Sequence, residues 1–229
     1  MWGVVFVKNK FLEAIKKREY FENFITRSIK CSNAIEGNTL SYAETYSIVF
    51  NDESLPLQNV NPRELYEAIN LKYAIDMSLS NLDRLDNGII VKFGDIINKN
   101  IKDTSGYRKI QNYINGADFV PPKPELVPSL MSELLYEFDN SECNIFEKIA
   151  KFHINFEHIH PFEDGNGRAG RLLINLQLIS NNEIPIVIDD SDRIRYFNLI
   201  QNYDIDGFVL FIKELQEREM LKMKEYDVY

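Results

Sequence analysis

His160-Pro-Phe-Glu-Asp-Gly-Asn-Gly-Arg-Ala-Gly-Arg171 is the stretch of sequence that decides both the fold and the site. Its glycines, Gly165, Gly167 and Gly170, allow the backbone to turn tightly and to approach a ligand closely. The main-chain amides that lead into the following helix form a concave donor surface at the positive end of that helix. The stretch therefore predicts a cradle for phosphate.

Charged and titratable side chains complete this loop. Arg168 and Arg171 are three residues apart, so they lie on adjacent turns of the new helix and can reach different phosphates of one polyphosphate chain. Asp164 supplies a hard oxygen ligand of the kind that Mg2+ prefers. His160, with a reference pKa of roughly 6.5, is suited to accept the proton of an attacking hydroxyl at neutral pH. Phe162 is expected to be an apolar plug that anchors the loop.

Two other nucleotide motifs match the loop in part. Gly165-x-Gly167-x-x-Gly170 fits the dinucleotide fingerprint, with Asp189 and Asp190 about 20 residues further on. That fingerprint requires a preceding β-strand, whereas the residues before the loop are helical in period. A P-loop would need Gly-Lys-Ser/Thr where this chain has arginines. Neither context fits.

A metal-dependent hydrolase is a further alternative. His158 and His160, with Glu157 and Glu163, could hold a transition metal, but their spacing matches no zinc signature. We interpret His158 as structural, together with His153, because a lone histidine is more often packed than catalytic.

The segments around the loop predict a mainly α-helical fold. Residues Ile145–Glu157 place their apolar side chains on one face and lead to His160, while Leu172–Ile179 is apolar on nearly every side, as in a helix buried at the centre of a bundle. Further helical periodicity covers residues 11–25, 63–79, 125–136 and 208–224. Asn115-Gly116 is a strong turn pair inside residues 107–122 and predicts a short β-hairpin there.

Bulk properties restrict the partners and the compartment. The chain has 229 residues, 45% hydrophobic and 27% charged, with a formal net charge of -9. An acidic chain disfavours nonspecific nucleic-acid binding, so proteins and small molecules are the expected partners. Cys31 and Cys143 lie far apart without metal-ligand spacing, which is typical of a reducing compartment. No targeting signal or membrane span is visible, and we expect a cytoplasmic protein.

The motif His160-x-Phe-x-Asp-Gly-Asn-Gly-Arg-x-x-Arg171 resembles the signature of Fic-domain (Fic/Doc family) proteins at every position. The resemblance covers roughly residues 86–215 and implies a Fic-type helical bundle with a short β-hairpin flap beside the active site. The flap would be Tyr107–Pro122, docking the target protein by main-chain pairing near Ile114, Asn115 and Gly116. We therefore divide the chain into an N-terminal helical region (1–86), a catalytic domain (87–215) and a C-terminal helical tail (216–229).

The resemblance also implies an activity, the transfer of AMP from ATP to Ser, Thr or Tyr hydroxyls of proteins with release of pyrophosphate. His160 would be the base and Asp164 the Mg2+ ligand. The ATP-binding residues implied by the resemblance are Gly165, Asn166, Gly167, Arg168, Gly170 and Arg171, with Tyr196 and Tyr203 from the stretch that walls the adenine pocket. Self-modification and a homodimer are implied in the same way.

A second motif, Ser32-Asn-Ala-Ile-Glu36-Gly37, resembles the inhibitory motif of the family, here placed before the core domain. Ser32 and Glu36 share one helix face, and Gly37 suits the residue that ends the helix. A carboxylate that reaches Arg171 would form a bidentate pair and displace the γ-phosphate. The motif thus predicts an enzyme that is shut in its resting state.

Several activities remain open on this evidence. Relatives that transfer the γ-phosphate have a degenerate second half of the motif, so the intact Arg171 favours AMP transfer. Some relatives use the inhibitory glutamate to position a water that removes AMP from modified proteins. Transfer of another phosphate-containing group is a further alternative, and a noncatalytic nucleotide-binding regulator would not need His160. The sequence does not identify the target protein.

Overall fold

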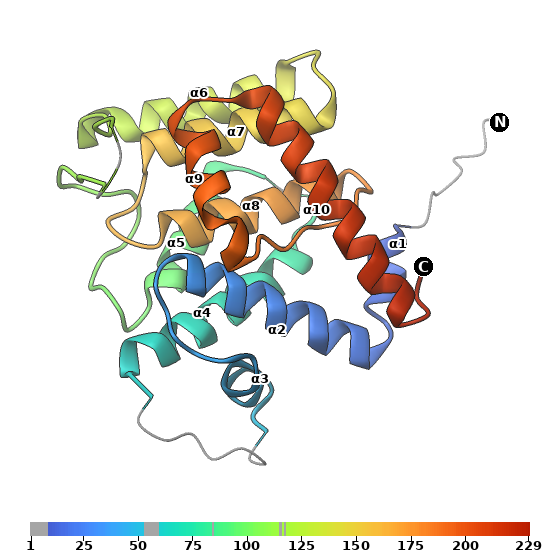
Figure 1. The fold of residues 1–229 in the computed structure, drawn as a ribbon. Helices are drawn as coiled ribbons and strands as arrows, with labels where there is room; N and C mark the ends of the chain where they lie inside the picture. The colour runs from blue at the N-terminus through green and yellow to red at the C-terminus, as the bar shows by residue number, and fades with distance from the viewer. Residues whose placement is uncertain (1–8, 53–59, 84, 115, 117) are drawn as a thin grey trace.

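The computed structural model describes residues 9–52, 60–83, 85–114, 116 and 118–229, which form a bundle of α-helices (Figure 1). The helices are α1 (Lys10–Ala14), α2 (Arg18–Ile35), α3 (Tyr42–Phe50), α4 (Pro62–Leu79), α5 (Asn87–Asn98), α6 (Val127–Asn140), α7 (Ile145–Ile159), α8 (Asn166–Ser180), α9 (Arg193–Gln201) and α10 (Ile205–Glu225), with 3-10 turns η1 (Pro124–Leu126) and η2 (Asp190–Asp192). The mainly α fold class is confirmed.

The two helices that flank the loop form where the sequence predicts them. The side chain of Asn144 caps the start of α7 by accepting a hydrogen bond from the Glu147 amide, and the apolar face of the helix then packs into the core. α8 is buried on nearly every side, as its apolar sequence predicts, and it contacts α2, α4, α5 and α7. The loop between α7 and α8 is therefore fixed at both ends by the centre of the bundle.

Helix α2 is held against the bundle by α10. Glu219, buried on α10, accepts hydrogen bonds from both terminal nitrogens of Arg27, each 2.8 Å long, and one from the Tyr20 hydroxyl, also 2.8 Å. At the end of the chain, Lys17 donates to the Tyr226 carbonyl at 2.7 Å. The N-terminal end of α2 and the C-terminal end of α10 thus lie close together (Figure 1).

The two predicted boundaries of the chain, at residues 86 and 215, lie differently with respect to the helices. The boundary between residues 215 and 216 cuts through the continuous helix α10, so residues 216–225 continue that helix. The boundary at residue 86 coincides with the cap of α5, because the Asp86 side chain accepts from the Ile89 amide at 2.8 Å. Even so, α2 and α4 on the N-terminal side of that boundary pack on α8.

The predicted hairpin is not present among the described residues of 107–122, which contain no strand. Pro121 and Pro122 have no N–H to donate to a ladder. Side chains connect the two arms instead, since the Gln111 carboxamide donates to the Pro121 carbonyl at 2.8 Å. Of the predicted tip, Ile114 is half-buried and Gly116 is exposed, while Asn115 lies outside the described residues.

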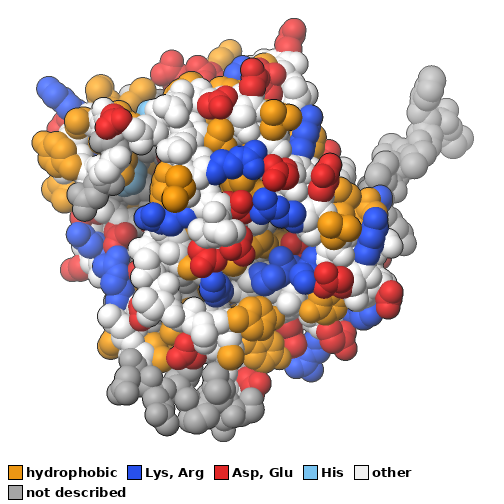
Figure 2. Space-filling view, viewed as in Figure 1, with side chains coloured by type: hydrophobic (Ala, Val, Ile, Leu, Met, Phe, Trp, Pro, Cys, Tyr) orange, Lys and Arg blue, Asp and Glu red, His pale blue; other side chains and the backbone are white. Residues whose placement is uncertain are grey.

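The surface mixes both signs of charge. On the face shown in Figure 2, Lys and Arg side chains are interspersed with Asp and Glu, in agreement with the many ion pairs on α2 and α10. Within the described part of the chain, every helix is too short or too polar to cross a membrane.

Candidate active site

The loop begins and ends at two residues with left-handed backbone conformation. His160 follows α7 with φ 51° and ψ 62°, and its amide donates to the Phe156 carbonyl at 2.9 Å. Gly165, with φ 75°, precedes α8, and a Cβ atom there would lie 2.6 Å from Cγ2 of Ile97. Only glycine fits both this conformation and this space. These two turns bring the residues of the motif to the N-terminus of α8.

Phe162 is the plug that the sequence predicts. Its ring is 1% exposed and packs near the rings of Tyr107 and Phe156, and a Cβ on Gly94 would lie 2.3 Å from it. The Asn166 carboxamide closes the loop by accepting from the Phe162 amide at 2.8 Å and donating to its carbonyl at 2.9 Å. The side chain of Asn166 therefore shapes the loop from within.

His160 is held through its backbone by a buried arginine. Arg108, 3% exposed, donates from Nε to the His160 carbonyl at 2.8 Å and from its terminal nitrogens to the carbonyls of Ile110, Pro122 and Ile159. Burial lowers the pKa of His160 to about 4, so the imidazole is neutral at pH 7. A neutral imidazole is ready to accept a proton.

Asp164 is an ionised carboxylate at the rim of the loop. Its Oδ1 accepts from the Gly165 amide at 2.6 Å and lies 3.4 Å from Nη2 of Arg168, while Oδ2 accepts from Arg63 at 2.6 Å. Burial opposes ionisation, but the two arginines hold the pKa of Asp164 below its usual value. One ionised, partly exposed carboxylate fits Mg2+, which takes few protein ligands and completes its shell with water and phosphate oxygens.

Arg168 is a buried cation whose hydrogen bonds are incomplete. Its side chain is 2% exposed, and Nη1 lies 3.4 Å from Glu67 on α4. Nε and Nη1 make no hydrogen bond to any described residue, and burial lowers the pKa of the guanidinium. Glu67 is shared, since it also accepts from Asn38 at 2.9 Å and from Arg63 at 3.0 Å. Unfilled donors on a buried guanidinium favour a ligand with several acceptor oxygens.

Arg171 is bound by the N-terminal motif. Its Nε donates to the Ser32 hydroxyl at 2.9 Å, and Nη2 donates to the Ser32 carbonyl and to Oε1 of Glu36, both at 2.8 Å. Glu36 raises the pKa of Arg171 above its usual value although burial opposes this. The pair with Glu36 uses one carboxylate oxygen and one nitrogen, so the predicted bidentate geometry is wrong because Ser32 takes the other donor.

Two glycines make room for these contacts. A Cβ on Gly167 would lie 2.3 Å from Oε1 of Glu36 and 2.8 Å from Nη1 of Arg171. Gly37 follows α2 with φ 96°, as the sequence predicts for the residue that ends this helix. The ion pair therefore lies directly on the glycine-rich loop.

A titratable cluster lies under α8. A Cβ on Gly170 would lie 2.3 Å from Oε1 of Glu157 and 2.9 Å from the His153 ring. Burial raises the pKa of Glu157 to about 8 and lowers that of His153 to about 3. The Tyr196 hydroxyl lies 2.9 Å from Nε2 of His153, and the Arg171 guanidinium carbon lies 5.7 Å from the Tyr196 ring centroid.

The two tyrosines predicted for the adenine pocket differ in exposure. Tyr196 is 0% exposed and belongs to the core, so it offers no face on which adenine could stack. Tyr203 is 46% exposed, and its ring meets the His158 ring edge-to-face. The Phe119 ring stacks on the same histidine, with 3.8 Å between the two ring centroids. Of the two tyrosines, Tyr203 alone keeps an accessible ring.

Residues 84–178 match the Fic/DOC family. The chain is 31% identical to the protein adenylyltransferase Fic of Nematostella vectensis over 88% of its own length, and 28% identical to a probable protein adenylyltransferase of Aquifex aeolicus over 93%. A Fic-domain signalling protein from Bacteroides thetaiotaomicron has the same fold, with a TM-score of 0.81, 24% identity and coverage of 93% of this chain and 89% of that one.

A Fic/DOC family domain is thus present in this chain. The chain spans 48% of the length of the Nematostella relative and 62% of the Aquifex relative, so it corresponds to about half of such proteins. The match to the family includes the loop from His160 to Arg171 but neither α2 nor α4. Those two helices nevertheless supply side chains that contact the loop.

The Fic signature does not predict the contacts that Arg63 and Glu67 of α4 make with the loop. Arg63 and Glu67 are four residues apart at the start of a helix, which is also the pattern of an ordinary surface ion pair. Arg63 reaches a carboxylate 101 residues away, and Arg108 binds carbonyls more than 50 residues away. No local periodicity indicates such contacts.

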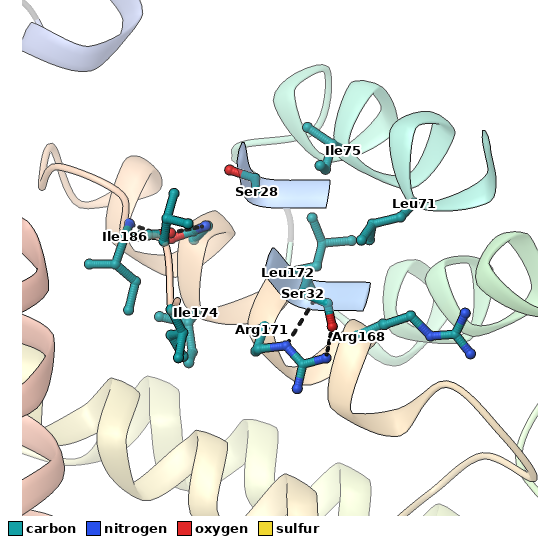
Figure 3. A pocket seen from close by; sticks show the side chains of 12 residues that line it. Ser28, Ser32, Leu71, Ile75, Arg168, Arg171, Leu172, Ile174 and Ile186 are labelled. Carbon is teal, nitrogen blue, oxygen red and sulfur yellow. Dashed lines mark hydrogen bonds between the residues drawn. The ribbon is translucent and has the colours of Figure 1, made fainter. Parts of the chain in front are cut away.

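A small cavity lies beside Arg171, between α2 and α8. Its volume is about 40 Å3, and its lining includes Ser28, Ser32, Leu71, Ile75, Arg171 and Leu172. Figure 3 shows Ser32 directed at Arg171, while Arg168 extends away from it. The Ser28 hydroxyl is buried there without a hydrogen-bond partner. The interface between α2 and the rest of the Fic fold is thus incompletely packed.

Proposed function

We propose that this chain is a protein adenylyltransferase that moves AMP from ATP to hydroxyl side chains of proteins. The observation that carries the proposal is the juxtaposition, at one helix N-terminus, of a neutral His160, an ionised Asp164 and two buried arginines with unfilled donors. Relatives named as protein adenylyltransferases support it. ATP is the co-substrate in this proposal.

Each residue has a defined task in the transfer. The amides of Asn166 and Gly167 and the Arg168 side chain bind phosphate oxygens, and His160 accepts the proton of the attacking hydroxyl. That hydroxyl oxygen then bonds to the α-phosphorus while the bond from the α-phosphorus to the bridging oxygen breaks, and pyrophosphate leaves. Mg2+, bound through Asp164, would neutralise charge that builds on the phosphates.

We further propose that Glu36 and Ser32 inhibit the enzyme. They use Nε and Nη2 of Arg171, which leaves only Nη1 for a γ-phosphate. An acidic group at this point also repels the triphosphate. ATP would then bind in a position from which AMP is not transferred.

The acceptor would be a Ser, Thr or Tyr hydroxyl, either on another protein or on a second copy of this chain. Residues 107–122 border the loop, because Asn112 donates to the Phe162 carbonyl at 2.8 Å. Tyr113 and Val120 of this segment are 77% and 65% exposed. They offer a surface for the protein that carries the hydroxyl.

Removal of AMP by water is a second candidate activity. Its support is the position of Glu36, whose Oε1 would lie 2.3 Å from a Cβ on Gly167 and so reaches the loop that binds phosphate. A water held by this carboxylate would face the phosphorus of an AMP-modified side chain.

The proposal is tested with ATP labelled separately at the α- and γ-phosphates, using the Glu36→Gly variant as the active form. We expect α-label on protein and no γ-label, and loss of the α-label in Glu36→Gly/His160→Ala. Ser80→Gly, which changes an exposed helix end on α4, is the matched control and should behave as wild type. Protein-bound γ-label alone would show a kinase and contradict the proposal.

A further inference from the structure

Arg63 joins the site from a helix that the loop motif does not include. It lies in the first turn of α4, where Asn61 caps the helix by accepting from the Arg63 amide at 2.9 Å. Its Nη2 donates to Oδ2 of Asp164 at 2.6 Å, and its Nε donates to Oε1 of Glu67 at 3.0 Å. The guanidinium therefore bridges two carboxylates.

The oxygen that Arg63 contacts is not the one that accepts from the loop amide. Oδ1 of Asp164 is already engaged by the Gly165 amide, with Arg168 at 3.4 Å. Oδ2 is left for any further cation, and Arg63 takes it. Two cations cannot share one carboxylate oxygen at contact distance without strong repulsion.

Arg63 is also placed to leave this position. Its side chain is 53% exposed, whereas that of Arg168 is 2% exposed. The bond from Nε to Glu67 does not depend on Asp164, so the guanidinium can turn about that anchor and release Oδ2. Solvent can then take over its freed donors.

We propose that Arg63 is a resident cation on Asp164, occupying the carboxylate oxygen that Mg2+ needs, and that the metal must displace it. This rests on the proposed function, because it takes Asp164 as the metal ligand. Arg63 keeps Asp164 neutralised and in place while no metal is bound. It also lowers the affinity for Mg2+, so that metal loading is coupled to the first turn of α4.

The test compares how much Mg2+ strengthens nucleotide binding. Calorimetry gives the dissociation constant of α,β-methylene-ATP with Mg2+ and with EDTA, in Glu36→Gly and in Glu36→Gly/Arg63→Gln. The ratio of the dissociation constant in EDTA to that in Mg2+ measures the contribution of the metal alone. A lost contact between Arg63 and phosphate would change both constants and cancel in the ratio. We expect the ratio to rise at least about threefold when Arg63 is replaced.

Two variants complete the design. Lys72→Gln removes one positive charge from an ion pair on the same helix, 2.6 Å from Asp76, and should leave the ratio unchanged. Asp164→Asn should bring the ratio close to one. If Asp164→Asn keeps the full Mg2+ effect, the assignment of the metal ligand fails. If Asp164→Asn behaves as expected but Arg63→Gln leaves the ratio unchanged or smaller, Arg63 does not compete with the metal.

Discussion

Single residues at this site take their chemical state from burial and neighbours. His160 is neutral because burial lowers its pKa, whereas Asp164, four residues on, stays ionised because two arginines outweigh burial. A deprotonated base and an ionised carboxylate are what the proposed hydroxyl transfer requires at neutral pH. The same loop holds a neutral His160 and an ionised Asp164, because His160 is enclosed and Asp164 lies beside two arginines.

The low pKa of His160 predicts a flat pH profile on the acid side. The base works when deprotonated, so a lowered pKa moves the acid limb to lower pH. At saturating Mg2+, we expect kcat/KM of the Glu36→Gly variant to change less than about twofold between pH 7.5 and 5.5. A histidine with an ordinary pKa of about 6.5 would lose about tenfold over this range. His158→Gln is the control and should have the same profile, and a midpoint near pH 6.5 would contradict the assignment.

At the scale of an element, α2 both closes the site and packs imperfectly. Ser28 and Ser32 lie one turn apart on the face that meets α8, yet only Ser32 has a partner there. A buried hydroxyl without a hydrogen bond costs free energy, and so does the cavity beside it. Helix α2 is therefore held less tightly than its many contacts suggest.

Filling this cavity should tighten the helix. We expect Ser28→Val, which removes the hydroxyl and adds methyl groups, to raise the free energy of unfolding by about 1 kcal/mol. It should also lower α-label incorporation by wild type, because in the proposed inhibition the site opens only when α2 moves. Thermal denaturation and the labelling rate measure the two effects. Ser28→Thr keeps the hydroxyl and should stabilise less; faster labelling in Ser28→Val would be evidence against the argument.

At the scale of the whole molecule, the local signals in the sequence predicted what is local in the structure. Helices α7 and α8 and the plug Phe162 follow from apolar periodicity and from the loop composition. The hairpin was wrong because the turn pair Asn115-Gly116 reports nothing about prolines further along the opposite arm. The burial of Tyr196 did not follow from the sequence, because periodicity does not tell which aromatic of a helix lies beneath a site and which lies beside it.

Contacts between distant segments account for the rest. Arg63, Glu67 and Arg108 act across separations that exceed any helical or strand repeat, and Arg108 binds carbonyl groups that every residue carries. The contact of Glu36 with Arg171 was expected only because two motifs resemble parts of one family. Its observed geometry, with Ser32 on Nε, depends on how α2 docks, which α10 fixes through Glu219.

The central claim is that a competent transfer site is shut by Glu36 through Arg171. The most direct measurement is the initial rate of α-label incorporation in wild type, Glu36→Gly, Arg171→Ala and the double variant, with folding checked by circular dichroism. Glu36→Gly removes one charge-assisted contact and should raise the rate at least about tenfold when Arg171 is present. It should give no gain when Arg171 is absent. Equal rates in wild type and Glu36→Gly, or a full gain without Arg171, would contradict the account.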